Sequence, residues 1–177
     1  MWRTRVGYAG GTTNDPIYRR IGDHTECFQV DFDPAAVSYD DLLQLFWSNH
    51  DPTRPAHSRQ YASIVLAHDE SQLSRAHASR DRLESVLQRP IITRIERLDR
   101  FYLAEDYHQK YRLRSSAPVM REFQAMYTND SDFVESSAAA RINGYLDGGG
   151  SCTRLESEIS EFGLSPEASR YVRSHCR

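Results

Sequence analysis

The 177-residue sequence has little cysteine, no excess of basic residues and no long apolar run. No stretch approaches the roughly 18 consecutive apolar residues that a membrane-spanning helix needs. Lysine and arginine number 22 against 25 acidic residues, so the net charge of −3 lacks the basic excess typical of nucleic-acid binding. The N-terminal residues MWRTRVGYAGG also lack the apolar stretch of a secretory signal. We therefore expect a soluble protein that binds neither nucleic acid nor membrane.

Cysteine is scarce, and its count is odd. Only Cys27, Cys152 and Cys176 are present. A small odd number is more typical of a reducing compartment than of a disulfide framework, so we expect a cytoplasmic protein. Hydrophobic residues make up 39% of the chain, which is enough for one packed domain with an extension.

Patterns for metal or phosphate binding are absent as well. His50, Asp51, Asp106 and His108 have suitable side chains, but their spacing matches no compact metal-binding pattern. The glycines of GYAGG (7–11) resemble those of a phosphate-binding loop, yet no Gly-Lys-Ser/Thr follows them. The sequence therefore predicts no metal and no bound cofactor.

The hydrophobic pattern predicts an α+β fold. Strands and helices alternate as strand, strand, helix, strand, helix, strand. Ser38, with Asp41 three residues later, is the predicted N-cap of the first helix, and Pro90 ends the second. The strands are expected at 3–8, 26–32, 61–67 and 91–98. This order predicts a ferredoxin-like α/β plait, that is, a mixed sheet with helices on one face.

From Ala117 onward the sequence becomes helical in character. The expected helices end at Met126, cover 131–146 and cover 165–176, with GGGS (148–151) as a flexible break. Ser165 is the predicted cap of the last helix, and Pro166 is its first residue. We therefore divide the chain into a domain of residues 1–115 and a helical C-terminal extension of residues 116–177.

Eight stretches of the first 111 residues resemble the A-type peptide methionine sulfoxide reductases, which reduce the S-epimer of methionine sulfoxide. They occur in the order typical of the family: VGYAGG (6–11), NDPIY (14–18), HTE (24–26), VDFDP (30–34), VSYDDLLQLFWSNHDPT (37–53), QYAS (60–63), ITRIE (92–96) and FYLAEDYHQKY (101–111). The resemblance implies a monomeric enzyme that acts on free or peptide-bound methionine sulfoxide. It implies no bound cofactor, with thioredoxin or another thiol as the electron donor.

The family's nucleophilic cysteine belongs to a GCFWG-type motif upstream of VGYAGG, and these 177 residues contain no such motif. We therefore expect an N-terminally incomplete form that lacks this segment and has negligible activity alone. The loops after Tyr18 and after Pro52 are shorter than in the family, so no aspartate is carried over there. Two other interpretations remain open: an inactive relative that binds oxidised methionine, or a protein-interaction module that kept only the fold.

The resemblance assigns three catalytic residues. HTE places at Glu26 the acid that protonates the sulfoxide oxygen, and burial of the strand face it shares with Phe28 would keep that acid protonated. NDPIY and QYAS place at Tyr18 and Tyr61 the hydroxyls that hold the oxygen. A phenol suits this task because it donates a hydrogen bond and stays neutral far above pH 7. The alternatives are a solvent-facing glutamate and ordinary aromatic packing.

The three cysteines lie in different sequence surroundings, which predict different roles. Alternation along the strand sends Cys27 to the face opposite Glu26, and the middle of a strand offers neither a helix N-terminus nor nearby cations to activate a thiol. We interpret Cys27 as a structural residue. Cys152 follows GGGS and is the candidate recycling cysteine, with a thiol that would resolve a sulfenic acid. The alternative is an incidental cysteine in a mobile segment, and Cys176 has the same two interpretations.

Overall fold

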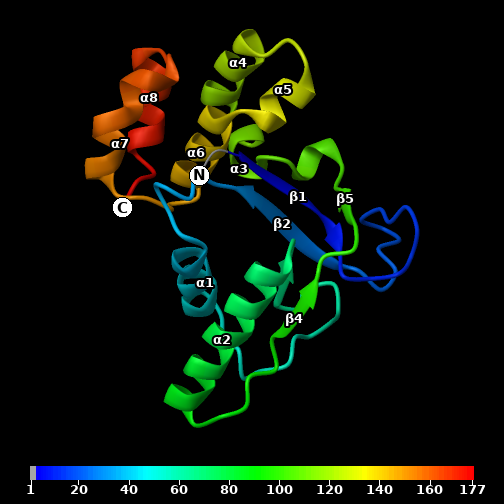
Figure 1. Ribbon diagram of the computed structural model, residues 1–177. Coiled ribbons are helices and arrows are strands. Elements are labelled where there is room, and N and C mark those ends of the chain that lie inside the picture. The colour runs from blue at the N-terminus through cyan, green and yellow to red at the C-terminus, as the bar shows by residue number, and fades with distance from the viewer. Residues whose placement is uncertain (1–2) are drawn as a thin grey trace. The chain divides into compact units, whose positions relative to one another are not determined.

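The computed structural model describes residues 3–177 (Figure 1). Its mixture of strands and helices confirms the predicted α+β class. Contacts divide the chain into two compact units. The N-terminal unit consists of residues 6–28 and 32–104, and the C-terminal unit consists of residues up to Arg5 together with 29–31 and 105–177. The predicted boundary between residues 115 and 116 stays a prediction.

A three-stranded sheet has the order β2-β1-β5. Its strands are β1 (Arg3–Ala9), β2 (Thr25–Asp31) and β5 (Phe101–Leu103). β1 and β5 are antiparallel, with Gly7 opposite Leu103. A Cβ atom at Gly7 would collide with the backbone carbonyl oxygen of Tyr102, so only glycine permits this close approach. The sequence did not predict β5, because three residues are too few for alternation to be recognised.

A second, parallel pair of strands lies in the N-terminal unit. β3 (Ile64–Ala67) pairs with β4 (Arg94–Arg97), and α2 (Glu70–Leu87) connects them as a crossover helix. The described residues therefore form two sheets, whereas the sequence predicted a single mixed one. α1 (Tyr39–Ser48) packs against α2, and Figure 1 shows the two helices side by side.

Helix α1 begins as the sequence predicted. Ser38 Oγ accepts a hydrogen bond from the Asp41 backbone N–H at 3.1 Å, and Asp41 Oδ2 accepts one from the Ser38 backbone N–H at 2.9 Å. This reciprocal pair is a capping box. One face of α1 buries Leu43 and Trp47, which form a core with Val65 and Ala76.

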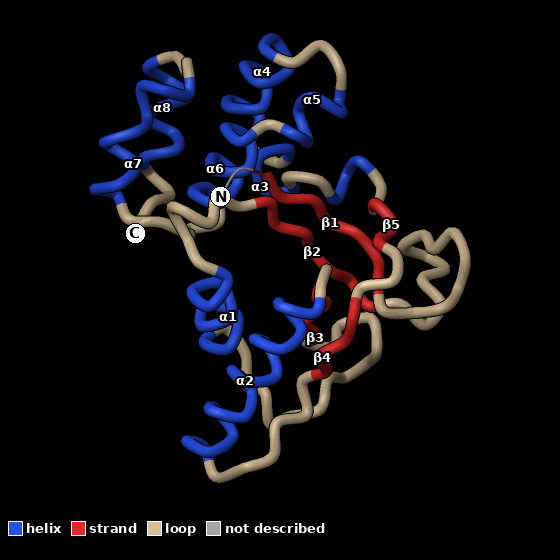
Figure 2. Tube along the Cα trace, viewed as in Figure 1, coloured by secondary structure: helices blue, strands red, loops and turns tan. Residues whose placement is uncertain are grey.

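The C-terminal unit is a set of short helices joined by short loops (Figure 2). Its elements are η1 (Asp106–His108), α3 (Tyr111–Arg114), α4 (Ala117–Met126), α5 (Asp130–Glu135), α6 (Ser137–Leu146), α7 (Cys152–Glu158), η2 (Ile159–Phe162) and α8 (Pro166–Arg173). Its core includes Leu113, Phe123, Phe133, Ile142 and Leu155. Among residues 3–177, no helix combines the length and the apolar character that crossing a membrane requires.

The prediction of one helix over 131–146 was wrong, because Ser136 interrupts it. Ser136 has extended backbone angles, φ −68° and ψ 128°, and its side chain accepts a hydrogen bond from the Ala139 N–H at 3.1 Å. A serine tolerates the interior of a helix but is strongly favoured as a cap, and here it begins α6. Helix α7 was also not predicted. By contrast, Ser165 caps α8 with Pro166 first, as expected.

In the C-terminal unit, salt bridges connect the start of β1 and the end of β2 to each other and to α5. Arg5 donates two hydrogen bonds to Glu135, at 2.5 and 2.8 Å, and its Nη2 lies 3.1 Å from Asp31 Oδ2. Arg3 contacts the same two carboxylates at 2.7 and 2.9 Å. The hydrogen bonds from Arg5 hold the pKa of Glu135 below its usual value. The buried Lys110 donates to the carbonyl oxygen of Thr4.

Candidate active site

Glu26 is the second residue of β2, and residues 59–61 lie beside it in the N-terminal unit. Its backbone N–H donates to the carbonyl oxygen of Gln60 at 2.9 Å. The side-chain amide of Gln60 donates in turn to Glu26 Oε1 at 2.6 Å. One residue earlier, Thr25 Oγ1 donates to the carbonyl oxygen of Arg59 at 2.8 Å. These three bonds hold the loop against the start of β2.

Two phenol hydroxyls meet at this loop. Tyr61 directly follows Gln60, and its oxygen lies 3.5 Å from that of Tyr18. Tyr18 lies in a turn that the Arg20 N–H closes by donating to the Ile17 carbonyl oxygen at 2.8 Å. The contact with Tyr18 raises the pKa of Tyr61, so this phenol is neutral at physiological pH. At this distance either hydroxyl can donate to the other.

His24 joins the glycine-rich loop to the start of β2. Its Nδ1 accepts a hydrogen bond from the Gly11 N–H at 3.2 Å, and its Nε2 lies 2.7 Å from the carbonyl oxygen of Thr13. Because an N–H only donates and a carbonyl only accepts, the ring is neutral with its proton on Nε2. Asp23 accepts hydrogen bonds from Thr12 and Thr13, which hold its pKa well below the usual range.

The strand face that carries Glu26 is only partly buried. Phe28, two residues along, is 70% exposed, and Glu26 itself is only half-buried. Strand alternation predicts which side chains share a face, but it does not predict what covers that face. The face that carries Glu26 is therefore open at Phe28 rather than covered along its whole length.

Cys27 has the environment of a structural thiol. It is half-buried, and its Sγ donates to the carbonyl oxygen of Thr25 at 3.3 Å. Burial raises the pKa of this thiol to about 11, so the nucleophilic thiolate is scarce near neutral pH. The nearby Arg94 guanidinium acts to lower the same pKa, so the expectation that no cation lies near this thiol was wrong, but burial has the larger effect.

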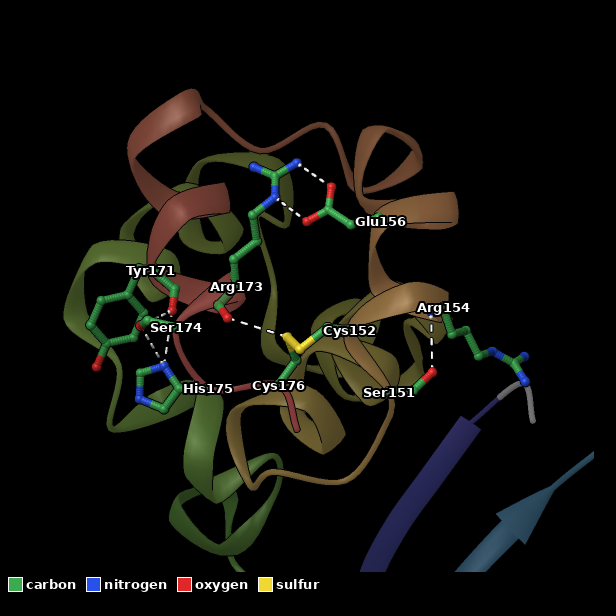
Figure 3. Close-up of a disulfide and its surroundings, with 9 residues drawn as sticks. All are labelled: Ser151, Cys152, Arg154, Glu156, Tyr171, Arg173, Ser174, His175 and Cys176. Atoms are coloured by element: carbon green, nitrogen blue, oxygen red, sulfur yellow. Dashed lines mark hydrogen bonds and ion pairs between the residues drawn. A yellow bond between two sulfur atoms is a disulfide. The ribbon is translucent and has the colours of Figure 1, made fainter.

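Cys152 and Cys176 form a disulfide in the C-terminal unit (Figure 3). Their Cα atoms are 5.1 Å apart, and the bond joins the first residue of α7 to the end of the chain. The odd cysteine count favoured free thiols, and for this pair that expectation was wrong, because a count does not show which segments approach each other. Arg173 of α8 and Glu156 of α7, paired at 2.6 and 3.0 Å, join these two helices. Cys152, the candidate recycling cysteine, thus has a partner in its own unit.

Metal-ligating side chains do not converge anywhere in residues 3–177. His50, one of the residues considered for a metal, lies 2.9 Å from both the Phe46 carbonyl oxygen and Thr93 Oγ1. Both of its ring nitrogens are therefore engaged in hydrogen bonds, one of them with the backbone of α1.

The sequence did not predict that Gln60 and His24 take part in the candidate site. Each lies inside a matching motif, directly before Tyr61 in QYAS or two residues before Glu26 in HTE. That adjacency was the available signal. The hydrogen bonds to Glu26 and to the glycine-rich loop depend on residues far away in the sequence, so the motif alone did not reveal their roles.

Comparison with known proteins gives consistent matches. The family model described as peptide methionine sulfoxide reductase matches residues 1–140. A peptide methionine sulfoxide reductase of Drosophila melanogaster is 41% identical over 176 residues, covering 98% of this chain and 70% of the relative. One from Salmonella arizonae is 42% identical over 125 residues, covering 63% of this chain and 59% of the relative.

Solved structures agree with this result. Reduced Mxr1 from Saccharomyces cerevisiae matches with a TM-score of 0.59 and 29% identity, covering 64% of this chain and 71% of that one. Methionine sulfoxide reductase A of Corynebacterium diphtheriae matches with a TM-score of 0.53 and 33% identity, covering 64% of this chain and 63% of that one. The resemblance read from the motifs is confirmed: the chain belongs to the peptide methionine sulfoxide reductase family.

Proposed function

We propose that this chain provides the part of a peptide-methionine (S)-S-oxide reductase site that binds the sulfoxide oxygen. Glu26 is the proton donor, and Tyr18 and Tyr61 hold the oxygen. The observation that supports this assignment is the 3.5 Å approach of the two hydroxyls beside the loop that is bonded to Glu26. We propose that an oxygen acceptor placed there receives a hydrogen bond from this pair of phenols and a proton from the acid.

In the family reaction, a thiolate attacks the sulfoxide sulfur while the acid protonates the departing oxygen. The cysteine becomes a sulfenic acid, a second thiol condenses with it to a disulfide, and thioredoxin reduces that disulfide. The 177 residues contain no GCFWG-type motif. Cys27 has a raised pKa, and Cys152 and Cys176 are bonded to each other. We propose that turnover requires a nucleophilic cysteine that this sequence does not supply.

The first test measures activity directly. This chain, incubated with a methionine S-sulfoxide peptide and dithiothreitol, is expected to form methionine at no more than the rate of dithiothreitol alone. Robust reduction would contradict the proposal. Repeating the assay with Cys27→Ser would then show whether Cys27 performs the attack.

The second test measures binding. Binding can be measured separately from turnover, because turnover requires a nucleophile that this sequence does not supply. We expect saturable binding of the S-sulfoxide peptide by isothermal titration, and weaker binding of the R-epimer. Tyr61→Phe removes one hydrogen-bond donor and should weaken binding about 3- to 10-fold. Tyr111→Phe is a matched control, because both tyrosines are 59% exposed and Tyr111 lies in the C-terminal unit.

Two outcomes of this titration would favour other functions. Binding that is lost in Glu26→Ala, without any turnover once a nucleophile is supplied, would indicate a methionine-sulfoxide-binding module. No binding of either epimer would leave a protein-interaction module that shares only the fold.

We further propose that the chain acts as a cytoplasmic monomer with thioredoxin as its reductant, and that Cys152 is the recycling cysteine. The disulfide to Cys176 gives thioredoxin a bond to reduce. Reduced thioredoxin should open it much faster than glutathione at the same thiol concentration, as measured by mass spectrometry after alkylation. Equal rates would argue against a recycling role, and sedimentation would test the monomer.

A further inference from the structure

Gln60 is bonded to Glu26 in two independent ways. Its carbonyl oxygen accepts from the Glu26 backbone N–H at 2.9 Å, and its side-chain amide donates to Glu26 Oε1 at 2.6 Å. We propose that Gln60 is a positioning residue that fixes Oε1 of Glu26 as an acceptor, so that Oε2 carries the proton given to the sulfoxide oxygen. This inference rests on the proposed function of Glu26.

The hydrogen-bonding chemistry of the two groups determines which oxygen is protonated. An amide NH₂ only donates, so the carboxyl oxygen that it contacts must accept. A neutral carboxylic acid has one carbonyl oxygen and one O–H. With Oε1 held as the carbonyl oxygen by Gln60, the O–H group is at Oε2.

The same contact favours proton transfer. While Glu26 is protonated, the bond from Gln60 joins two neutral groups. When the Oε2 proton moves to the sulfoxide oxygen, Glu26 becomes a carboxylate and the bond becomes charge-assisted, which roughly doubles its strength. Gln60 therefore stabilises the state after proton transfer more than the state before it.

The backbone bonds separate this role from a role in folding. The contacts Glu26 N–H to Gln60 O and Thr25 Oγ1 to Arg59 O hold the loop without any contribution from the Gln60 side chain. A Gln60→Met substitution keeps them and keeps the length of the side chain. It removes the side-chain amide, and with it the N–H that reaches Oε1.

Two ionisable side chains near Glu26 stay neutral at physiological pH. Burial raises the pKa of Cys27 to about 11, and the pKa of Tyr61 is also raised. Both ring nitrogens of the buried His24 are hydrogen-bonded, to the Gly11 N–H and to the Thr13 carbonyl oxygen. Glu26→Gln is the variant that assigns a pH-dependent change, because a change caused by the Glu26 carboxyl group is absent from it.

Nuclear magnetic resonance tests the contact without any ligand. In the wild-type chain, a side-chain amide proton of Gln60 should move downfield as pH rises, because its bond becomes charge-assisted. In Glu26→Gln, this movement should disappear. A Gln60 signal that is insensitive to pH in the wild-type chain would overturn the inference, whether or not sulfoxide binds.

Sulfoxide binding tests the positioning role. Binding of the S-sulfoxide peptide should weaken at high pH, and in Gln60→Met this weakening should begin at a higher pH, because the amide that stabilises the carboxylate is gone. Gln44→Met, an exposed change on α1, should leave the profile unmoved. A uniform weakening at every pH would show a merely structural role and overturn the inference. If the wild-type chain binds no sulfoxide while the Gln60 signal titrates, the proposed function fails but the contact stands.

Discussion

Cys27 and Glu26 are adjacent, yet their side chains leave β2 on opposite faces, so their chemistry is determined separately. The Glu26 carboxyl group is held by a polar loop, whereas the Cys27 thiol is half-buried and bonded to the Thr25 carbonyl oxygen. Burial disfavours the charged thiolate and is the largest cause of the raised pKa of Cys27. Adjacency in the sequence therefore says little about shared function here.

We expect Cys27 to react slowly with iodoacetamide. Since only the thiolate reacts and its pKa is about 11, labelling at pH 8 should be roughly 100-fold slower than for the unfolded chain. The rate should rise with pH until the thiol ionises near pH 11. Mass spectrometry of the non-reduced protein measures this rate, with labelling in guanidinium chloride as the control. Equal rates in the folded and unfolded chains would contradict the structural interpretation.

The site could be predicted only as far as its motifs extend. HTE, NDPIY and QYAS predicted Glu26, Tyr18 and Tyr61 as site residues, and the hydroxyls of Tyr18 and Tyr61 lie 3.5 Å apart. The catalytic roles of the three residues stay predictions. The exposure of Phe28 could not be predicted, because it depends on what packs against the sheet rather than on the alternation of the strand itself.

At the scale of elements, α1 and α2 are joined by a buried hydrogen bond. The indole N–H of Trp47 donates to Ser79 Oγ at 3.0 Å, and both residues are buried. A buried donor that loses its partner costs more than the bond itself contributes.

Ser79→Ala should therefore lower the free energy of unfolding by about 1 to 3 kcal/mol in urea denaturation. In a Trp47→Phe background no indole N–H remains, so the added cost of Ser79→Ala should fall below about 0.5 kcal/mol. The same cost in both backgrounds would show that the hydrogen bond does not matter and that the loss arises from packing alone.

Elements with local signals were predicted well, and elements without them were not. The capping box at Ser38 and the Ser165-Pro166 pair each identified the start of a helix, because the signal and its effect lie within one turn. Ser136 carried an ambiguous signal, and β5 depends on pairing with a strand more than 90 residues away. Long-range pairing leaves no trace in a local pattern.

At the scale of the whole molecule, the disulfide and the proposed site belong to different contact units. The disulfide spans 24 positions, and closing a loop of this length restricts the unfolded chain by about 3 kcal/mol. Its effect should be confined to the unit in which both cysteines lie.

A Cys152→Ser/Cys176→Ser variant should therefore exchange the most protected amide hydrogens of α7 and α8 roughly 100-fold faster than the oxidised protein. Those of α1 and α2 should be unchanged and serve as the internal control. Reduction of the wild-type protein with dithiothreitol should reproduce the effect. Faster exchange throughout both units would show that the disulfide stabilises the whole chain.

The predicted order of the first six elements, β1 to β4, and the α+β class were correct, but the division of the chain by contacts did not follow the sequence order. Composition changes at Ala117 and suggested a boundary there. Contacts instead group the ends of β1 and β2 with residues 105–177, because Arg5 and Asp31 lie within the charge network around Glu135. Local composition does not predict such a grouping, because the grouping depends on contacts between residues that are far apart in the sequence.

That charge network limits how the protein can be divided into fragments. A fragment that begins at residue 105 would contain Glu135 and Lys110 but neither Arg5 nor Thr4, to which they are bonded. A cut anywhere between residues 32 and 104 separates the same partners. The two fragments of such a split protein would have to associate to restore these contacts. Co-expression of both fragments is therefore expected to give the C-terminal unit intact, whereas expression of either fragment alone is not.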